Sequence, residues 1–216
     1  RFLSEKYPAK KGRLPRIVLD IWRKADGARG KPDQYSWQAI NTVLRTKRTT
    51  GAAMLGAYAV ANRRPAKRYA EGRANRYPTS PLIGTVGVTP RRGARASFKL
   101  NHLSTATARL TPQGLDAPGW KLRLTFDLPS QARGSSALVT STSKAGRATT
   151  KRVRLNRQGN GVLRAPFSKK KVANVEVTIV NGGGHFKCFV PGGNFSCSGK
   201  PLDNGLQMKF TAFAVR

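Results

Sequence analysis

The period of the apolar residues changes near position 77, and this change constrains the fold more than any other feature of the sequence. After it, short runs of β-branched and alternating residues recur about every ten positions, the spacing of strands in a β-sandwich or barrel. In residues 120–128, apolar side chains alternate with Lys121, Arg123, Thr125 and Asp127, so one face of that strand is expected to be buried and the other wet. The other predicted strands are 95–101, 104–110, 136–143, 149–155, 160–167, 172–180, 185–190 and 206–215.

The first 75 residues have the period of amphipathic helices instead. Three helices are expected: one begins near Leu14, one follows Ser36 as its N-cap, and one begins near Thr50 and stops near Arg63-Arg64-Pro65. Aromatic residues such as Trp22 recur at helical spacing in these segments, and we interpret them as core rather than as the lining of a ligand pocket.

Together these patterns predict an α+β fold in which an N-terminal helical remnant precedes an antiparallel β-sandwich. The expected division is a helical segment at 1–76, which would be the distal end of a larger, peptidase-like domain, a linker at 77–94 and an accessory sandwich at 95–216. Residues 1–8 are typical of the last turns of a helix that began earlier, so we expect the chain to be a piece of a longer polypeptide. No apolar run approaches the roughly 18 residues of a transmembrane helix.

Residue types that carry catalysis or bind metals are scarce. The chain has 9 Asp+Glu, 2 His and 2 Cys, and it contains no H-E-x-x-H, C-x-x-C, G-x-S-x-G or phosphate-loop motif. We therefore assign no catalytic residue, no metal ligand and no cofactor within this chain. His102 and His185 lie far apart in the sequence, and we expect each to be structural or on the surface.

Cys188 and Cys197 flank a segment that contains Pro-Gly-Gly-Asn, a tight-turn sequence. Short strands on either side of that turn would bring the two Cα atoms within the roughly 4.4–6.8 Å that a disulfide allows. Such a local disulfide is typical of an exported protein. The alternative is a pair of free thiols in a reducing compartment.

Several short segments of the sequence are similar to segments of a known protein family. They are RFLSEKYP at 1–8, QYSWQAI at 34–40, AVANRRP at 59–65, HLSTAT at 102–107, VRLNR at 153–157, VEVTIVN at 175–181 and the segment 188–204. In these stretches the chain resembles the C-terminal part of a family of secreted zinc metallopeptidases of actinobacteria and related soil bacteria. In that family the zinc-binding H-E-x-x-H precedes the stretch that resembles residues 1–8. The resemblance therefore implies that zinc and all catalytic residues belong to an upstream domain.

The charge of the chain is extreme, with 41 Lys+Arg against 9 Asp+Glu and a formal net charge of +32. A field of this strength attracts polyanions. The densest clusters are alternatively ordinary solvated surface, and we select six of their residues as candidates for polyanion binding: Arg91, Arg92, Arg95, Lys169, Lys170 and Lys171. Motifs that recognise a nucleic-acid sequence are absent, so nucleic acid is expected only as a non-specific partner.

Two functional hypotheses follow for an extracellular protein. The first is a non-catalytic accessory region of a secreted metalloprotease, whose helices buttress an upstream peptidase domain and whose sandwich is adhesive. The second is an independent, strongly basic protein that binds a cell-wall polymer, an acidic polysaccharide or nucleic acid.

Overall fold

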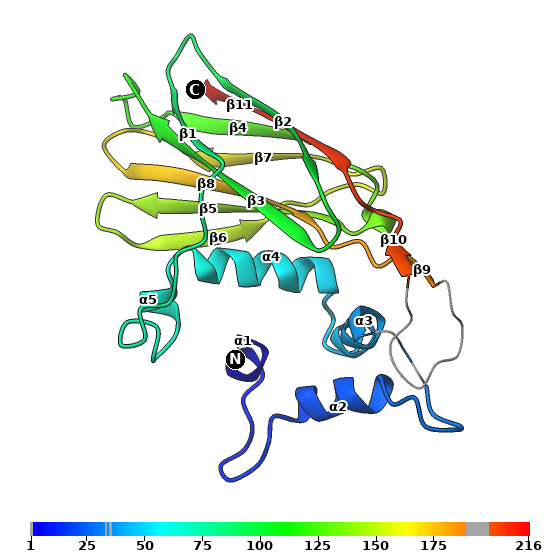
Figure 1. The fold of residues 1–216 in the computed structure, drawn as a ribbon. Coiled ribbons are helices and arrows are strands. Elements are labelled where there is room, and N and C mark those ends of the chain that lie inside the picture. Colours follow the sequence, from blue (N-terminus) through cyan, green and yellow to red (C-terminus); the bar gives the residue numbers. More distant parts are fainter. Residues whose placement is uncertain (1, 33, 35, 189–198) are drawn as a thin grey trace.

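Helices and strands divide the chain as the change of period predicts, and the α+β class is confirmed (Figure 1). The computed structural model describes residues 2–32, 34, 36–188 and 199–216. Its helices are α1 (Phe2–Lys6), α2 (Arg16–Lys24), α3 (Ser36–Thr46), α4 (Gly51–Asn62), α5 (Pro65–Arg68) and the short 3-10 helix η1 (Gln131–Arg133). Its strands are β1 (Gly84–Val88), β2 (Ala94–Leu100), β3 (Ser104–Pro112), β4 (Lys121–Asp127), β5 (Ser135–Ser143), β6 (Ala148–Arg152), β7 (Asn160–Pro166), β8 (Val172–Asn181), β9 (Phe186–Cys188), β10 (Gly199–Pro201) and β11 (Leu206–Val215).

Two sheets packed face to face form the sandwich. The five-stranded sheet has the order β1-β3-β8-β5-β6 and the four-stranded sheet the order β2-β11-β4-β7, while β9 and β10 form a separate pair. Among the described strands, neighbours are antiparallel except for β1 and β3, which run parallel. The alternation predicted for residues 120–128 is confirmed in β4, where Leu122, Leu124 and Phe126 are at most 1% exposed and belong to the sandwich core.

Helix α4 covers the outer face of the five-stranded sheet, where it packs against β5 and β8 (Figure 1). The close approach depends on its small residues, because a Cβ atom at Gly56 would lie only 2.3 Å from Cδ1 of Leu138. Strand β8 is therefore covered on both faces: Val175, Val177 and Ile179 point into the sandwich core, and the alternate side chains face the helices. Among the described residues, no helix is long and apolar enough to cross a membrane.

The structure differs from the sequence predictions in several places. Strand β1 lies within residues 77–94, the predicted linker, where it pairs with β3 and fully buries Val88. Helix α5 and strand β10 were not predicted, because elements of three or four residues are too short to show a period. The interpretation of Trp22 as core is wrong: its side chain is 71% exposed, whereas Ile17 on the same helix is 2% exposed. Helix α2 packs against α3 and α1 rather than against the sandwich (Figure 1). Ile17, with Val18 and Ile21 beside it, joins the core between these helices, and Trp22 does not.

Candidate functional site: a basic end of the sandwich

Two cationic segments that are far apart in the sequence meet at one end of the sandwich. The turn between β1 and β2 carries Arg91 and Arg92, and the turn between β7 and β8 carries residues 169–171. The chain that leaves β3 joins the two turns: the Gln113 N–H donates to the Val88 carbonyl at 2.9 Å, and the Lys169 N–H donates to the Leu115 carbonyl at 2.9 Å. The sheet topology thus brings together the candidate clusters that the sequence analysis treated as separate.

The cationic side chains of both turns are exposed to solvent. Thr89 Oγ1 accepts hydrogen bonds from the backbone N–H groups of Arg92 at 2.9 Å and of Arg91 at 3.3 Å, which leaves both guanidinium groups exposed. The Lys171 N–H donates to the Ser168 carbonyl at 3.1 Å, and Ser168 is 1% exposed. A fully buried residue therefore anchors a turn whose three lysines are all exposed. Arg95, which lies just inside β2, is also exposed, and its Cζ is 5.9 Å from the centre of the Phe213 ring.

Further cations surround these two turns. The Lys144 N–H donates to the Lys171 carbonyl at 3.1 Å, which attaches the β5–β6 hairpin to the lysine turn. The guanidinium of Arg216 lies 4.9 Å from the centre of the Trp120 ring. Among the described residues, the loops at this end carry a single acidic side chain, Asp116. We call this surface the basic end; its cations are Arg91, Arg92, Arg95, Lys121, Lys144, Arg147, Lys169, Lys170, Lys171 and Arg216.

A cationic hollow of about 480 Å³ lies beside the basic end, between helices α4 and α5 and strands β5 and β6. We call it the basic groove. The hairpin residue Gly146 lines it, so the groove and the basic end share the β5–β6 hairpin. Hydroxyl groups line its sheet side, where Thr140 and Thr150 are hydrogen-bonded to each other at 2.9 Å. Its cationic side chains come from the helical segment: Lys6, Arg64, Lys67 and Arg68.

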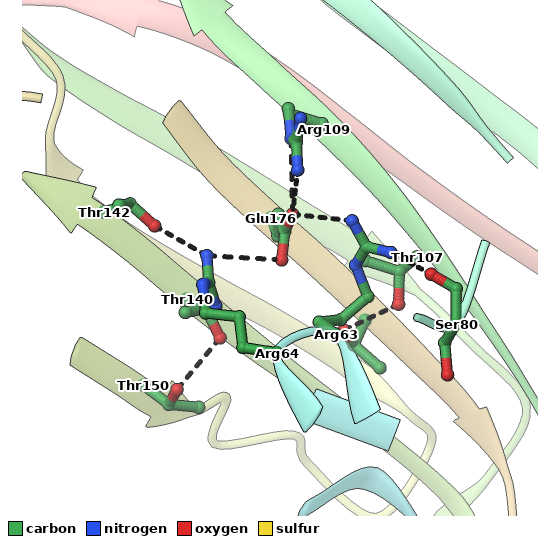
Figure 2. Close-up of polar contacts among 10 residues, drawn as sticks. Arg63, Arg64, Ser80, Thr107, Arg109, Thr140, Thr142, Thr150 and Glu176 are labelled. Atoms are coloured by element: carbon green, nitrogen blue, oxygen red, sulfur yellow. Dashed lines mark hydrogen bonds and ion pairs between the residues drawn. The ribbon is translucent and has the colours of Figure 1, made fainter. Parts of the chain in front are cut away.

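A buried carboxylate fixes the helical wall of this groove against the sheet (Figure 2). Glu176 of β8 is 2% exposed, and it receives Arg109 of β3 at 2.7 Å and Arg63 at 3.2 Å on Oε1. Arg64 lies 3.7 Å from Oε2 and also donates to Thr142 Oγ1 at 2.8 Å. We call these four residues, Glu176 with Arg63, Arg64 and Arg109, the Glu176 cluster.

The charge state of Glu176 follows from two opposing effects. Burial raises the pKa of the carboxyl group, but hydrogen bonds from Arg109 and Arg63 and the charges of Arg63 and Arg64 outweigh it, so the pKa is lowered. Glu176 is therefore ionised at neutral pH and holds Arg64 at the edge of the basic groove. Sequence reasoning missed this role. The available signal was one acidic residue in the middle of an otherwise apolar and β-branched strand.

At the opposite end of the sandwich, both histidines lie near the carboxylate of Asp203. Asp203, 1% exposed, lies 3.0 Å from Nδ1 of His185 and 2.9 Å from Nε of Arg133. Burial lowers the pKa of His102, against the opposing charge of Asp203. No sequence motif connects these residues, because they come from separate loops. Among the described residues, no group of three or more His, Cys, Asp or Glu side chains is arranged to hold a metal ion.

The predicted cysteine pair lies outside the described residues. Next to it, β9 and β10 pair antiparallel, with Gly199 opposite Cys188. Of these two strands, β9 lies within the predicted run 185–190. The disulfide between Cys188 and Cys197 stays a prediction, because Cys197 and the side chain of Cys188 are not described.

No family model and no curated protein sequence matches the chain. Among solved structures, a β-glucosidase from Paenibacillus barengoltzii aligns with 62% of this chain at 12% identity and a TM-score of 0.26. The CBM22-1–GH10 modules of the Clostridium thermocellum endo-1,4-β-D-xylanase 10B, complexed with xylohexaose, align with 47% of it at 10% identity and a TM-score of 0.24. The alignments span 12% and 17% of those two chains.

Proposed function

We propose that this protein binds anionic polymers through the basic end and the adjoining basic groove. The observation that carries the proposal is the convergence of Arg91, Arg92 and residues 169–171, which main-chain hydrogen bonds to the 113–115 segment hold at one end of the sandwich. Exposed cations that are not neutralised by acidic side chains of the same protein attract polyanions. Among the described residues, none of these five cations forms an ion pair with an acidic side chain.

A polymer fits this surface better than a small anion. The cations come from several loops and one helical segment, so they are spread over a surface that extends from the basic end to the basic groove. A chain with repeated negative charges can contact the basic end, pass the β5–β6 hairpin and continue into the basic groove. Single-stranded nucleic-acid binding uses free aromatic rings as stacking platforms, but the rings of Trp120 and Phe213 at this end already lie against Arg216 and Arg95. We therefore favour an acidic polysaccharide or an anionic cell-wall polymer over nucleic acid.

The test compares two variants with the same change in net charge. The first replaces Arg91, Arg92, Arg95, Lys169, Lys170 and Lys171 by Glu. The control replaces six exposed cations of the helical half by Glu: Lys10, Lys11, Arg13, Arg29, Lys31 and Arg45. Retention on immobilised heparin is measured as the salt concentration of elution, and binding to a soluble acidic polysaccharide is measured as a function of salt.

The expected result is that the first variant elutes at clearly lower salt than the control. The slope of log K against log salt should also flatten more in the first variant, because each polymer charge that is no longer neutralised removes roughly 0.7–0.9 from a slope of the nucleic-acid type. Equal losses in the two variants would mean that only total charge matters, and the proposed surface would be rejected.

A second candidate function is the accessory region of a secreted metallopeptidase. One observation favours it: α2 and the residues before it expose Leu14, Leu19 and Trp22 at 86%, 45% and 71%. Helix α2 lies on the side of the helical segment away from the sandwich (Figure 1), and an upstream domain that packs there would cover these apolar side chains. Zinc would belong to that domain. Intact mass and zinc content of the native protein test this function, because a species near 23.5 kDa without zinc would contradict it.

A further inference from the structure

A cavity of about 300 Å³ opens between the two sheets, at the side where β6 and β7 form the sheet edges. We call it the edge cleft. Its floor is aliphatic and consists of Val139, Leu163, Ala165 and Val172. Val139 and Val172 also belong to the sandwich core, so the cleft reaches the core from the side. It lies on the inner face of β6, whereas the basic groove lies against the outer face of the same strand.

The opening persists because the last strand of the five-stranded sheet has no large apolar side chain to close it. All five residues of β6 are exposed, and its two inward residues are Thr149 and Lys151. In a closed sandwich, these positions would carry the aliphatic residues that fill the space between the sheets. Here a hydroxyl and an ammonium group stand at the rim of an aliphatic floor.

The rim is cationic. Arg147 and Lys151 are exposed and line the cleft, and no acidic side chain lines it. Among the described residues, neither cation takes part in an ion pair. Ser141 also lines the cleft and adds a hydroxyl group. An occupant of this cleft must therefore combine an anionic group at the rim with aliphatic surface at the floor.

We propose that the edge cleft binds a free carboxylic acid with a medium-length aliphatic chain. The chain would cover Val139, Ala165 and Val172, and the carboxylate would lie between Arg147 and Lys151. The volume is at the lower end of the roughly 300–1,000 Å³ of small-molecule pockets, which suits a single short chain. A sugar would fit the floor poorly, because its hydroxyl groups would lose water without gaining partners there. The edge cleft shares Arg147 with the basic end, but it uses neither the Arg91–Arg92 turn nor the lysine turn, so the proposal does not rest on polyanion binding there.

The first experiment measures the affinity of the intact chain for butyrate, hexanoate, octanoate and decanoate by calorimetry at fixed ionic strength. Each added methylene that is buried should tighten binding by roughly fourfold, until the cleft is full. Decanol should bind more weakly than decanoate, because it lacks the charge that the rim selects. Affinity that does not change from butyrate to decanoate would overturn the proposal, since the acids would then be responding to net charge alone.

Two matched pairs of variants locate the site. Thr149→Trp places a ring over the cleft, while Thr125→Trp places the same ring on the exposed outer face of β4. Lys151→Glu reverses a rim charge, while Arg164→Glu reverses an exposed charge on β7 next to the floor residue Leu163. Thr149→Trp should abolish the dependence on chain length, and Lys151→Glu should weaken decanoate binding about fivefold or more. The two control variants should bind like the wild type.

The proposal fails if the members of either pair behave alike. It also fails if vesicles of an anionic lipid bind but decanoate does not, because the surface would then recognise a membrane rather than a free acid. Heparin retention of Thr149→Trp should equal that of the wild type, so the edge cleft and the basic end can be rejected independently of each other.

Discussion

Replacing Glu176 by Gln removes the charge that joins the helical segment to the sandwich while it leaves the shape of the side chain nearly unchanged. The carboxylate is 2% exposed and is the acidic partner of Arg63, Arg64 and Arg109 (Figure 2). Without this carboxylate, three guanidinium groups remain close together where the C-terminal end of α4 meets the sheet, and they lose their shared acidic partner. We therefore expect Glu176→Gln to destabilise both the sandwich and the packing of the helices on it.

The size of the effect follows from burial. Arg63 and Glu176 have side chains that are 7% and 2% exposed, and removal of one partner of a buried ion pair costs about 3–5 kcal/mol. Arg64 and Arg109 are 27% and 34% exposed, so water screens their charges, and they add little once the carboxylate is gone. The expected total is about 3–5 kcal/mol, which lowers Tm by roughly 6–20 °C for a domain of 150–250 residues.

The effect depends on pH with a definite sign. Since the pKa of Glu176 is lowered in the folded protein, the carboxylate stabilises the fold fully above its unfolded pKa, for which the reference value is 4.5. This contribution is lost as the pH falls through the folded pKa. The difference in stability between wild type and Glu176→Gln should therefore be constant from pH 7 to about 5.5 and shrink at lower pH.

Urea and thermal unfolding, followed by circular dichroism, measure both quantities. The matched control is Asp127→Asn, which removes the acid of an ion pair with Lys209 at 3.6 Å in which both side chains are more than half exposed. That variant should lose no more than about 1 kcal/mol. If Glu176→Gln loses no more than Asp127→Asn, or if its deficit is unchanged at low pH, the reasoning about the Glu176 cluster is refuted.

Two further predictions concern a turn and an exposed apolar side chain. Gly134→Ala should destabilise more than Gly146→Ala by about 1–3 kcal/mol: both glycines have a φ near +77°, but only at Gly134 would a Cβ atom meet backbone, 2.3 Å from the carbonyl carbon of Gly182. Equal losses in chemical denaturation would contradict this contact. Trp22→Ser should leave Tm within about 1 °C and reduce self-association in sedimentation velocity, because the ring is 71% exposed. A large fall in Tm would show instead that the ring is packed.

The sequence predicts strands better than it predicts the basic end. The run from 206 to 215 is correct to the residue, and the run from 172 to 180 is short by Asn181 alone, because alternation and β-branching report burial directly. Strand β1 escapes prediction, since its burial pattern has only Val88 fully inside and its partner is a parallel strand. The charge clusters at Arg91 and Lys169 are visible in the sequence, but their proximity is not.

By itself, the sequence determined that helices precede a sandwich of strands, which faces of the long strands point inward, and the excess of positive charge. These properties depend on the spacing of neighbouring residues, so they can be read along the chain. Only the tertiary structure decided that Glu176 lies among Arg63, Arg64 and Arg109, and that the turn of Arg91 meets that of Lys169. Both depend on which strands become neighbours. The strand order depends on the packing of the two sheets and of helix α4 on the outer face of one of them. The spacing of residues within a single segment does not reveal it.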